Sequence, residues 1–306
     1  MLAKTLDGAQ RLGEGLSQML LPLGFRMLVL ASLLTLLFNP PLMFSDASTG
    51  CTAGVTLSLF CQGISVPLVR WAAIVVCVIN LWPRHIPGGV LLQWAVAHSI
   101  RRSISSPDGG DSITANLLFL LVPLSLCAPH VFNLRDRRFL SATEALILRM
   151  TLALIGLQMA VVYFDAAITK AYVPEWRDGT ALFYILTMPA FGDFQPTSLL
   201  WPLISTRVVA LLTYGTLFLE FSLAFAWLGT ERAKALILVA GLSFHALIAL
   251  VMGLPTFGLA MGAGLLLYLH PFKPVEGESL SSLTRSVFGP SSFAADRGSL
   301  RSQLNS

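Results

Sequence analysis

Eight apolar segments decide what this chain can fold into. A membrane-spanning helix needs about 20 mostly apolar residues, and most of the segments approach or exceed that length. They show no alternation of apolar and polar positions, which argues against the strands of a β-barrel. The third segment is short and contains polar residues, so we expect a half-span or a tilted helix there. The segments are Leu20–Leu42, Val66–Trp82, Pro87–Ile100, Ile113–Ala128, Ala142–Thr169, Thr206–Leu228, Ala233–Met252 and Pro255–His270.

Charged residues are too scarce for a soluble fold. Asp, Glu, Lys and Arg make up 12% of the 306 residues, and the mean hydropathy is +0.74. A soluble domain usually carries about 25% charged residues. Because so few charges cannot cover a soluble surface, we exclude a soluble enzyme, a disordered protein and a nucleic-acid-binding protein. The sequence therefore predicts an all-α, polytopic membrane protein with about eight transmembrane helices.

The basic residues of the loops predict the orientation of the chain. With a cytoplasmic N-terminus, twelve Lys and Arg residues lie inside and five outside, as the positive-inside rule requires. Both termini are then cytoplasmic. We expect residues 1–19 to form a cytoplasmic N-terminal segment, 20–272 the transmembrane domain, and 273–306 a disordered cytoplasmic tail. The net charge of +4 then reflects topology and needs no acidic partner.

Two cysteines lie in the first external loop. Cys51 and Cys61 occupy a stretch without Lys or Arg, on the side of the membrane that is oxidising in most bacteria. We predict a disulfide between them, with two free thiols as the alternative. No histidine or second cysteine pair lies nearby, so a zinc site is not expected, and we predict no metal site elsewhere. Cys77 and Cys127 lie in apolar runs and are expected to be small core residues.

Ionisable residues inside the apolar segments are the first candidates for function. Each costs about 2.5–3.5 kcal/mol to place at the centre of a membrane-spanning helix. Glu220 and His245 lie deepest, and for them a functional role and a helix-pairing role are about equally favoured. For Arg70 and Arg149, near segment ends, a pairing or snorkelling contact is favoured.

The densest external cluster follows the fifth segment. Tyr163 and Lys170 are seven residues apart and so lie on one helix face, two turns from each other. Trp176 and Gly179 follow in the longest loop between segments. A lysine at a membrane boundary usually snorkels to the head groups. A lysine desolvated against apolar walls can instead lose its proton and act as a general base. The residues alone leave both roles of Lys170 open.

A second external loop contains the sequence Asp108-Gly109-Gly110-Asp111. Asp111 or Ser112 is expected to cap the helix that follows. The two carboxylates are alternatively a binding site for a cation or a partner. Two acidic residues three positions apart are weak evidence for a metal without further ligands.

The order and spacing of these residues resemble the horizontally transferred transmembrane (HTTM) domain. This is the membrane domain of vitamin-K-dependent gamma-carboxylase and its bacterial relatives. A further part of the chain is similar to the sporulation-delaying-protein-B branch, whose members help to mature a secreted peptide toxin. The similarity covers about residues 20–272. The HTTM pattern is found in Val162–Lys170, Trp176, Gly179–Ala181, Glu220, Phe244, His245, Phe257 and Met261, and that of the branch in Trp94, His98, Ser99, Arg101 and Asp108–Ile113.

The resemblance implies roles for individual residues. In the carboxylase, a lysine of this motif is the base that deprotonates reduced vitamin K. Lys170 is therefore the implied general base here, with His245 and Glu220 as further candidate catalytic residues. The cofactor is unknown, and a membrane quinol such as menaquinol is the candidate. The candidate substrate- or quinone-binding residues are Tyr163, Trp176, Gly179, Trp94, His98, Arg101, Asp108, Gly109, Gly110 and Asp111.

We therefore expect a multi-pass protein of the bacterial cytoplasmic membrane that matures a secreted antimicrobial or toxin peptide. Quinol-coupled, carboxylase-like chemistry is the candidate reaction. The expected partners are the lipid bilayer, the secreted precursor peptide and a small accessory protein that replaces the soluble domain of the carboxylase; no nucleic acid is expected. Two alternatives stay open, namely a peptide exporter and a non-catalytic toxin-binding or immunity protein, so the sequence does not decide whether the protein is an enzyme.

Overall fold

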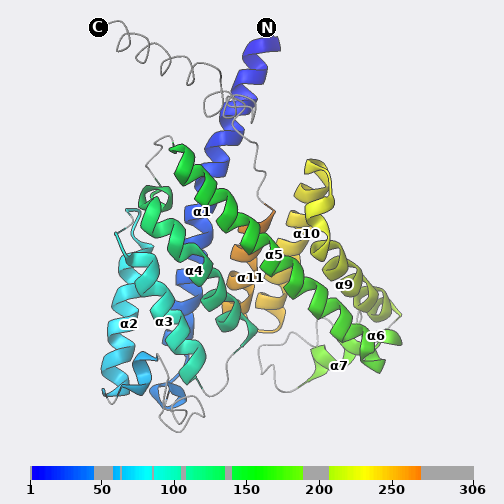
Figure 1. Ribbon diagram of the computed structural model, residues 1–306. Helices are drawn as coiled ribbons and strands as arrows, with labels where there is room; N and C mark the ends of the chain where they lie inside the picture. The colour runs from blue at the N-terminus through cyan, green and yellow to red at the C-terminus, as the bar shows by residue number, and fades with distance from the viewer. Residues whose placement is uncertain are drawn as a thin grey trace, which may run out of the picture. The chain divides into compact units, whose positions relative to one another are not determined.

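The computed structural model describes residues 2–44, 58–62, 64–84, 86–104, 108–134, 140–188 and 207–269, with side chains from Leu20 on except at Leu42. Every regular element in these ranges is a helix (Figure 1), as the sequence predicts. The main helices are α1 (Leu2–Phe38), α2 (Val66–Leu81), α3 (Gly89–Ser103), α4 (Gly109–Cys127), α5 (Ala142–Tyr172), α9 (Val208–Ala224), α10 (Glu231–Val251) and α11 (Pro255–Tyr268). The shorter helices are η1 (Pro41–Phe44), η2 (Leu59–Cys61), η3 (Pro129–Phe132), α6 (Pro174–Arg177), α7 (Ala181–Thr187) and η5 (Ala226–Leu228).

Each of the eight apolar segments coincides with one main helix, but the helices differ in length. Four of them are long and apolar enough to cross a membrane, namely α1 from Leu20 on, α4, α5 and α10. The helices α2, α9 and α11 are apolar but shorter, and α3 has 15 residues. The structure thus supports a helical membrane protein with four candidate spans, and the number of eight spans stays a prediction.

Capping residues explain where two of the long helices begin. At the start of α5, Ser141 and Glu144 form a capping box, in which the Glu144 N–H donates to Ser141 Oγ and the Ser141 N–H donates to Glu144 Oε2. Asp108 and Asp111 form the same arrangement at the start of α4. These contacts satisfy backbone N–H groups that have no partner within the helix.

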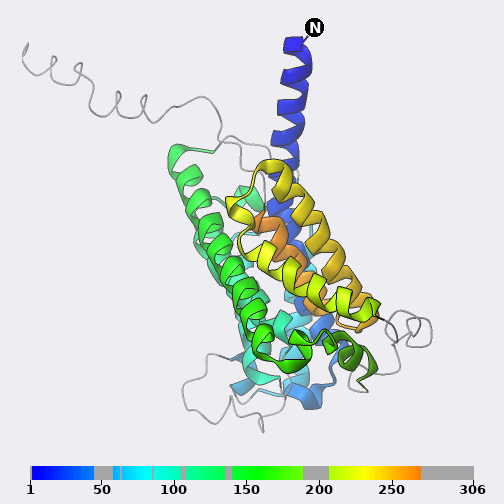
Figure 2. The same ribbon diagram turned by 90° about the vertical axis from the view of Figure 1, so that its right-hand side faces the viewer.

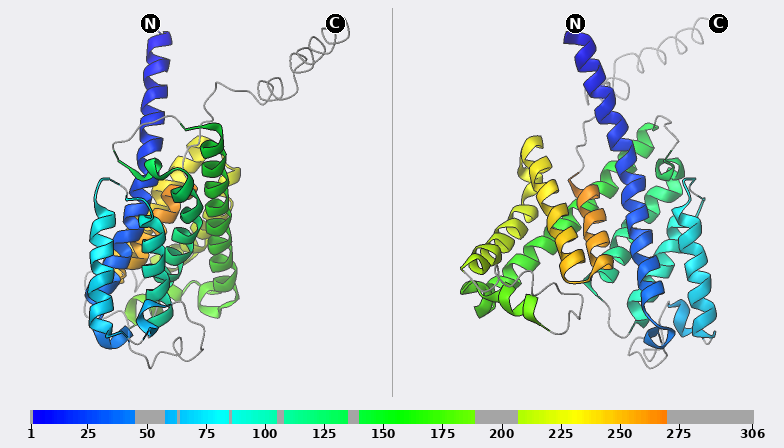
Figure 3. Two further views of the ribbon diagram at one scale, coloured as in Figure 1. Left: turned by 60° about the vertical axis from the view of Figure 1, so that its left-hand side comes forward. Right: turned by 180° about the vertical axis from the view of Figure 1, so that it is seen from behind.

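The helix α11 lies at the centre of the packing. It contacts α1, α4, α5 and α10, and every residue from Ala260 to Leu267 is buried. In Figure 3, right, orange α11 lies between α10 and blue α1. A helix that is apolar on all sides is suited to such an enclosed position. The helix α5 also contacts α9, and α9 contacts α10 (Figure 2), so these helices form one connected set around α11.

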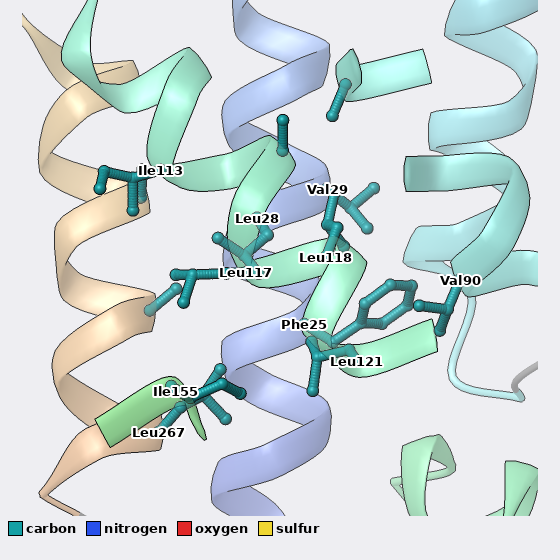
Figure 4. Close-up of a cluster of buried hydrophobic side chains, with 14 of the residues drawn as sticks. Phe25, Leu28, Val29, Val90, Ile113, Leu117, Leu118, Leu121, Ile155 and Leu267 are labelled. Atoms are coloured by element: carbon teal, nitrogen blue, oxygen red, sulfur yellow. The ribbon is translucent and has the colours of Figure 1, made fainter. Parts of the chain in front are cut away.

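An apolar cluster joins α1 to α4 (Figure 4). Phe25 and Leu28 of α1 pack with Leu117, Leu118 and Leu121 of α4, and all five side chains are at most 1% exposed. Lipid tails are as apolar as leucine, so close packing rather than the exclusion of water stabilises such a contact in a membrane. On α10, large apolar side chains remain exposed, as contact with lipid would require; they include Leu236, Val239, Leu247 and Leu250.

Arginines bind the ends of neighbouring helices. Arg70 donates hydrogen bonds to the carbonyl groups of the last turn of α1, so the structural contact expected for this residue is confirmed. Arg26 joins three separate segments through its guanidinium group. Its acceptors, at 2.9–3.2 Å, are the carbonyl oxygens of Pro22, Trp82, Pro83 and Phe132.

The cysteines give a mixed result. Cys61 is disulfide-bonded. Cys51 lies outside the described residues, so its pairing with Cys61 stays a prediction. Cys77 is a buried free thiol, as expected for a small core residue. Cys127 is also free but exposed, so its predicted core position is wrong; it is the last residue of α4. The predicted tail 273–306 lies outside the described residues.

The predicted orientation can be tested by labelling single cysteines in intact cells. In a background with Cys77 and Cys127 replaced by serine, we expect a membrane-impermeant maleimide to label Glu175→Cys, because Glu175 is exposed on the outer side in this topology. Glu231→Cys, also exposed, should be labelled only after permeabilisation. The background protein without a new cysteine is the control. The opposite labelling pattern would contradict the predicted orientation.

Candidate functional site

Lys170 of α5 and Glu220 of α9 form an ion pair. The Lys170 Nζ atom lies 2.8 Å from Oε1 and 3.0 Å from Oε2 of Glu220. The side chain of Glu220 is 8% exposed and that of Lys170 is 28% exposed. Because Cα–Cβ bonds of a helix tilt toward its N-terminus, Lys170 is directed back along α5. In this structure the lysine therefore binds a carboxylate within the helical bundle, and does not simply extend toward the head groups.

The short helix α6 folds back over this pair. Trp176 is 7% exposed, and the centre of its ring lies 5.5 Å from Lys170 Nζ, which is within the range of a cation–π contact. The chain leaves α6 through Gly179, whose φ angle is +82°. A Cβ atom at this position would lie 2.9 Å from Cβ of Ala210 on α9. Glycine is therefore required here by conformation and by space, and it lets the turn pack closely on α9.

Tyr163 and His245 form a second contact along the same face of α5. The Tyr163 hydroxyl and the His245 Nε2 atom are 2.9 Å apart, and the two residues are 1% and 2% exposed. The His245 Nδ1 atom is buried and has no hydrogen-bond partner among the described residues. An unpaired buried polar atom costs about 1–3 kcal/mol. Stability alone therefore does not explain this histidine, and it remains a candidate functional residue.

Trp94, His98 and Arg101 lie elsewhere, at the contact between α3 and α4. The Trp94 ring centre is 5.5 Å from that of His98 and 5.6 Å from that of Phe119. Arg101 donates a hydrogen bond to Oδ1 of Asn116, at 3.0 Å. Trp94 and Arg101 thus join α3 to α4, and His98 packs against Trp94 within α3. None of these contacts involves the Lys170–Glu220 pair.

Asp108 is the N-cap of α4, and the side chains of Asp108 and Asp111 also bind two other helices. Oδ1 of Asp108 accepts from the Asp111 N–H at 2.8 Å, and its Oδ2 accepts from Thr256 Oγ1 of α11 at 2.6 Å. Oδ1 of Asp111 accepts from Thr35 Oγ1 of α1 at 2.9 Å. The capping residue is therefore Asp108, and not Asp111 or Ser112 as expected, because Asp111 occupies the third position of the capping box. Among the described residues, no group of three or more potential ligands could hold a metal ion.

Sequence reasoning missed three polar residues that support these motifs. Thr35 and Thr256 bind the two carboxylates described above. The hydroxyl of Tyr214 on α9 donates to the carbonyl oxygen of Arg177 at 2.8 Å, and so fastens the turn that carries Trp176. Thr256 follows a proline at the start of an apolar run, which indicates a helix start. No local signal shows that its partner lies 148 residues away.

Comparison with known proteins gives the family. The chain is 30% identical over 254 residues to the sporulation-delaying protein SdpB of Bacillus subtilis. The matched residues make up 79% of this chain and 78% of SdpB. The chain belongs to the SdpB family. It is also 32% identical over 262 residues to the uncharacterized protein YitO of the same organism, which covers 80% of this chain and 82% of YitO.

Membership of the SdpB family confirms the more specific of the two resemblances. No family model matches the chain, so the relationship to the HTTM domain stays a prediction. No solved structure matches it either. The roles of single residues in this SdpB-family protein are therefore inferred from the geometry of the Lys170–Glu220 pair and of the contacts around it.

The Lys170–Glu220 pair should contribute more to stability than a surface pair of the same kind. Replacing Glu220 by Gln leaves Lys170 without its counter-charge, and we expect the free energy of unfolding to fall by about 1–3 kcal/mol. The matched control is Glu231→Gln, which removes the partner of Lys234; Glu231 is 61% exposed, and exposed pairs contribute about 0–1 kcal/mol. Denaturant titration in detergent measures both. Equal losses of unfolding free energy in the two variants would show that the Lys170–Glu220 pair stabilises the fold no more than an exposed pair does.

Proposed function

We propose that this protein is a membrane component in the maturation of a secreted toxin peptide, and that Lys170 and Glu220 form its reactive centre. Membership of the SdpB family supports the first part. The single observation that carries the second is the ion pair at 2.8 Å between two helices of a chain with few charges. Charged groups within membrane helices are costly and for that reason are frequently functional.

The geometry of the pair allows it to hold and transfer one proton. In the ion-pair form, Lys170 is protonated and Glu220 is ionised. Transfer of the proton over this short hydrogen bond produces a neutral amine and a neutral carboxylic acid. The neutral Nζ atom of Lys170 is then a general base.

The resemblance to the HTTM domain adds a candidate cofactor to this proposal. A bound membrane quinol would supply an oxidisable ring hydroxyl group to such chemistry. The residues present fit this role: once Glu220 holds the proton that leaves Lys170, the neutral Lys170 Nζ atom can take one further proton from the ring hydroxyl. The ring of Trp176 lies 5.5 Å from the amine, within the range of a cation–π contact. Carboxylation of the peptide is the candidate outcome, and it would need carbon dioxide as the added group and dioxygen as the oxidant of the quinol.

The proposed topology has eight spans with both termini in the cytoplasm. It places Lys170 on the outer side of the membrane, where a secreted precursor peptide arrives. A small accessory protein is the proposed second partner, which would bind the peptide as the soluble domain does in the carboxylase. The peptide is then modified or prepared for cleavage at the outer surface.

The proposal is tested by comparing secreted peptides of the source bacterium. A deletion strain is complemented with the gene for the native protein, for Lys170→Ala or for Lys234→Ala. The culture supernatants of all four strains are then analysed by mass spectrometry. We expect a secreted peptide that is present with the native protein and with Lys234→Ala, and that is absent or changed in mass with Lys170→Ala and in the deletion strain. Lys234 is the matched control, because it also pairs with a glutamate, but with one that is 61% exposed, whereas Glu220 is 8% exposed.

The alternatives predict different results in the same experiment. A peptide exporter predicts a peptide of unchanged mass that accumulates inside the deletion strain. A toxin-binding or immunity protein predicts an unchanged secreted peptide and loss of cell viability. A mature peptide identical to the native one in cells that contain full levels of Lys170→Ala would show that Lys170 is not the base.

A further inference from the structure

We propose that Gly109 and Gly110 position His245, with Phe257 as the connecting residue. The assignment to a functional site rests on the proposed function, whereas the contacts themselves do not. The Asp108-Gly109-Gly110-Asp111 motif then supports His245, which contacts Tyr163 on the face of α5 that also carries Lys170. It need not bind a substrate, a cation or a partner.

The first turns of α4 and α11 approach closely at Gly110 and Phe257. A Cβ atom at Gly110 would lie 2.7 Å from Cα and 2.9 Å from the backbone nitrogen of Phe257. Side chains do not tolerate such distances to backbone atoms, so only glycine allows the first turns of the two helices to meet here. The hydrogen bond from Thr256 Oγ1 to Asp108 Oδ2, at 2.6 Å, holds the same two turns together.

The ring of Phe257 contacts both Gly109 and His245. A Cβ atom at Gly109 would lie 3.3 Å from Cε2 of Phe257, so the ring lies directly against this glycine. The ring centre of Phe257 is also 5.6 Å from that of His245, with 67° between the planes. The ring thus contacts the α4 turn on one side and the imidazole on another, in an edge-to-face arrangement that aromatic rings favour.

His245 in turn contacts Tyr163 of α5. His245 is fixed by three neighbours, namely Phe257, Phe244 at 5.1 Å between ring centres, and the Tyr163 hydroxyl at 2.9 Å. Tyr163 shares its face of α5 with Lys170. The series of contacts from Gly110 to Phe257, His245 and Tyr163 therefore connects the start of α4 with the helix that carries the proposed base.

Chemical labelling of His245 tests this inference. Diethylpyrocarbonate is applied to the purified full-length protein in detergent, and modification of His245 is followed by peptide mass spectrometry. His245 is 2% exposed, so its labelling is slow in the native protein. We expect Gly110→Ala and Phe257→Leu to make it about tenfold faster, because local opening releases the imidazole. Phe257→Tyr, which keeps the ring, should remain close to native.

A second glycine on α11 is the matched control. In Gly264→Ala, the new Cβ atom meets the flexible end of Met159 at 2.6 Å, two turns from Phe257. We expect its His245 labelling to stay native. An unchanged rate in folded Gly110→Ala, or an equal increase in Gly264→Ala, would overturn the proposal. Because labelling needs no peptide substrate, failure of the proposed function would leave this result unaffected, and the reverse also holds.

Discussion

A charged side chain within a membrane must find its partner inside the protein, and the pair of Lys170 and Glu220 is where this constraint is clearest. The pair joins α5 to α9 through two hydrogen bonds. Other polar groups of the chain follow the same rule. Arg26 binds four carbonyl groups, and the carboxylates of Asp108 and Asp111 bind threonine hydroxyls on α11 and α1. The helices are thus connected by few polar contacts within an apolar packing.

The sequence predicts the helices well because most of the apolar runs are long and continuous. Their ends are less well predicted, because capping depends on single residues. Asp111 or Ser112 was expected to cap α4, but the cap is Asp108. The common face of Tyr163 and Lys170 follows from helical periodicity alone. The partners of these residues do not, because Glu220 lies 50 and His245 lies 82 positions further along the chain.

Family membership and site geometry contribute different parts of the account. Similarity to SdpB covers most of both chains and establishes the relationship, but it does not define the chemistry. The chemistry is inferred from the partly buried pair of Lys170 and Glu220 and from the ring of Trp176 beside it. The motif around Gly110 shows why position matters. It was a candidate binding loop in the sequence, and in the structure it packs against the residue that contacts His245.

Exchange of the two charges tests the central claim most directly. The double variant Lys170→Glu, Glu220→Lys keeps an ion pair between α5 and α9 but moves the amine to the other helix. The account predicts that this protein folds with a free energy of unfolding within about 1 kcal/mol of the native value, since the pair is retained. It also predicts that the mature peptide is absent from the culture supernatant. A normal mature peptide made by the exchanged pair would contradict the account, because the pair would then only connect two helices.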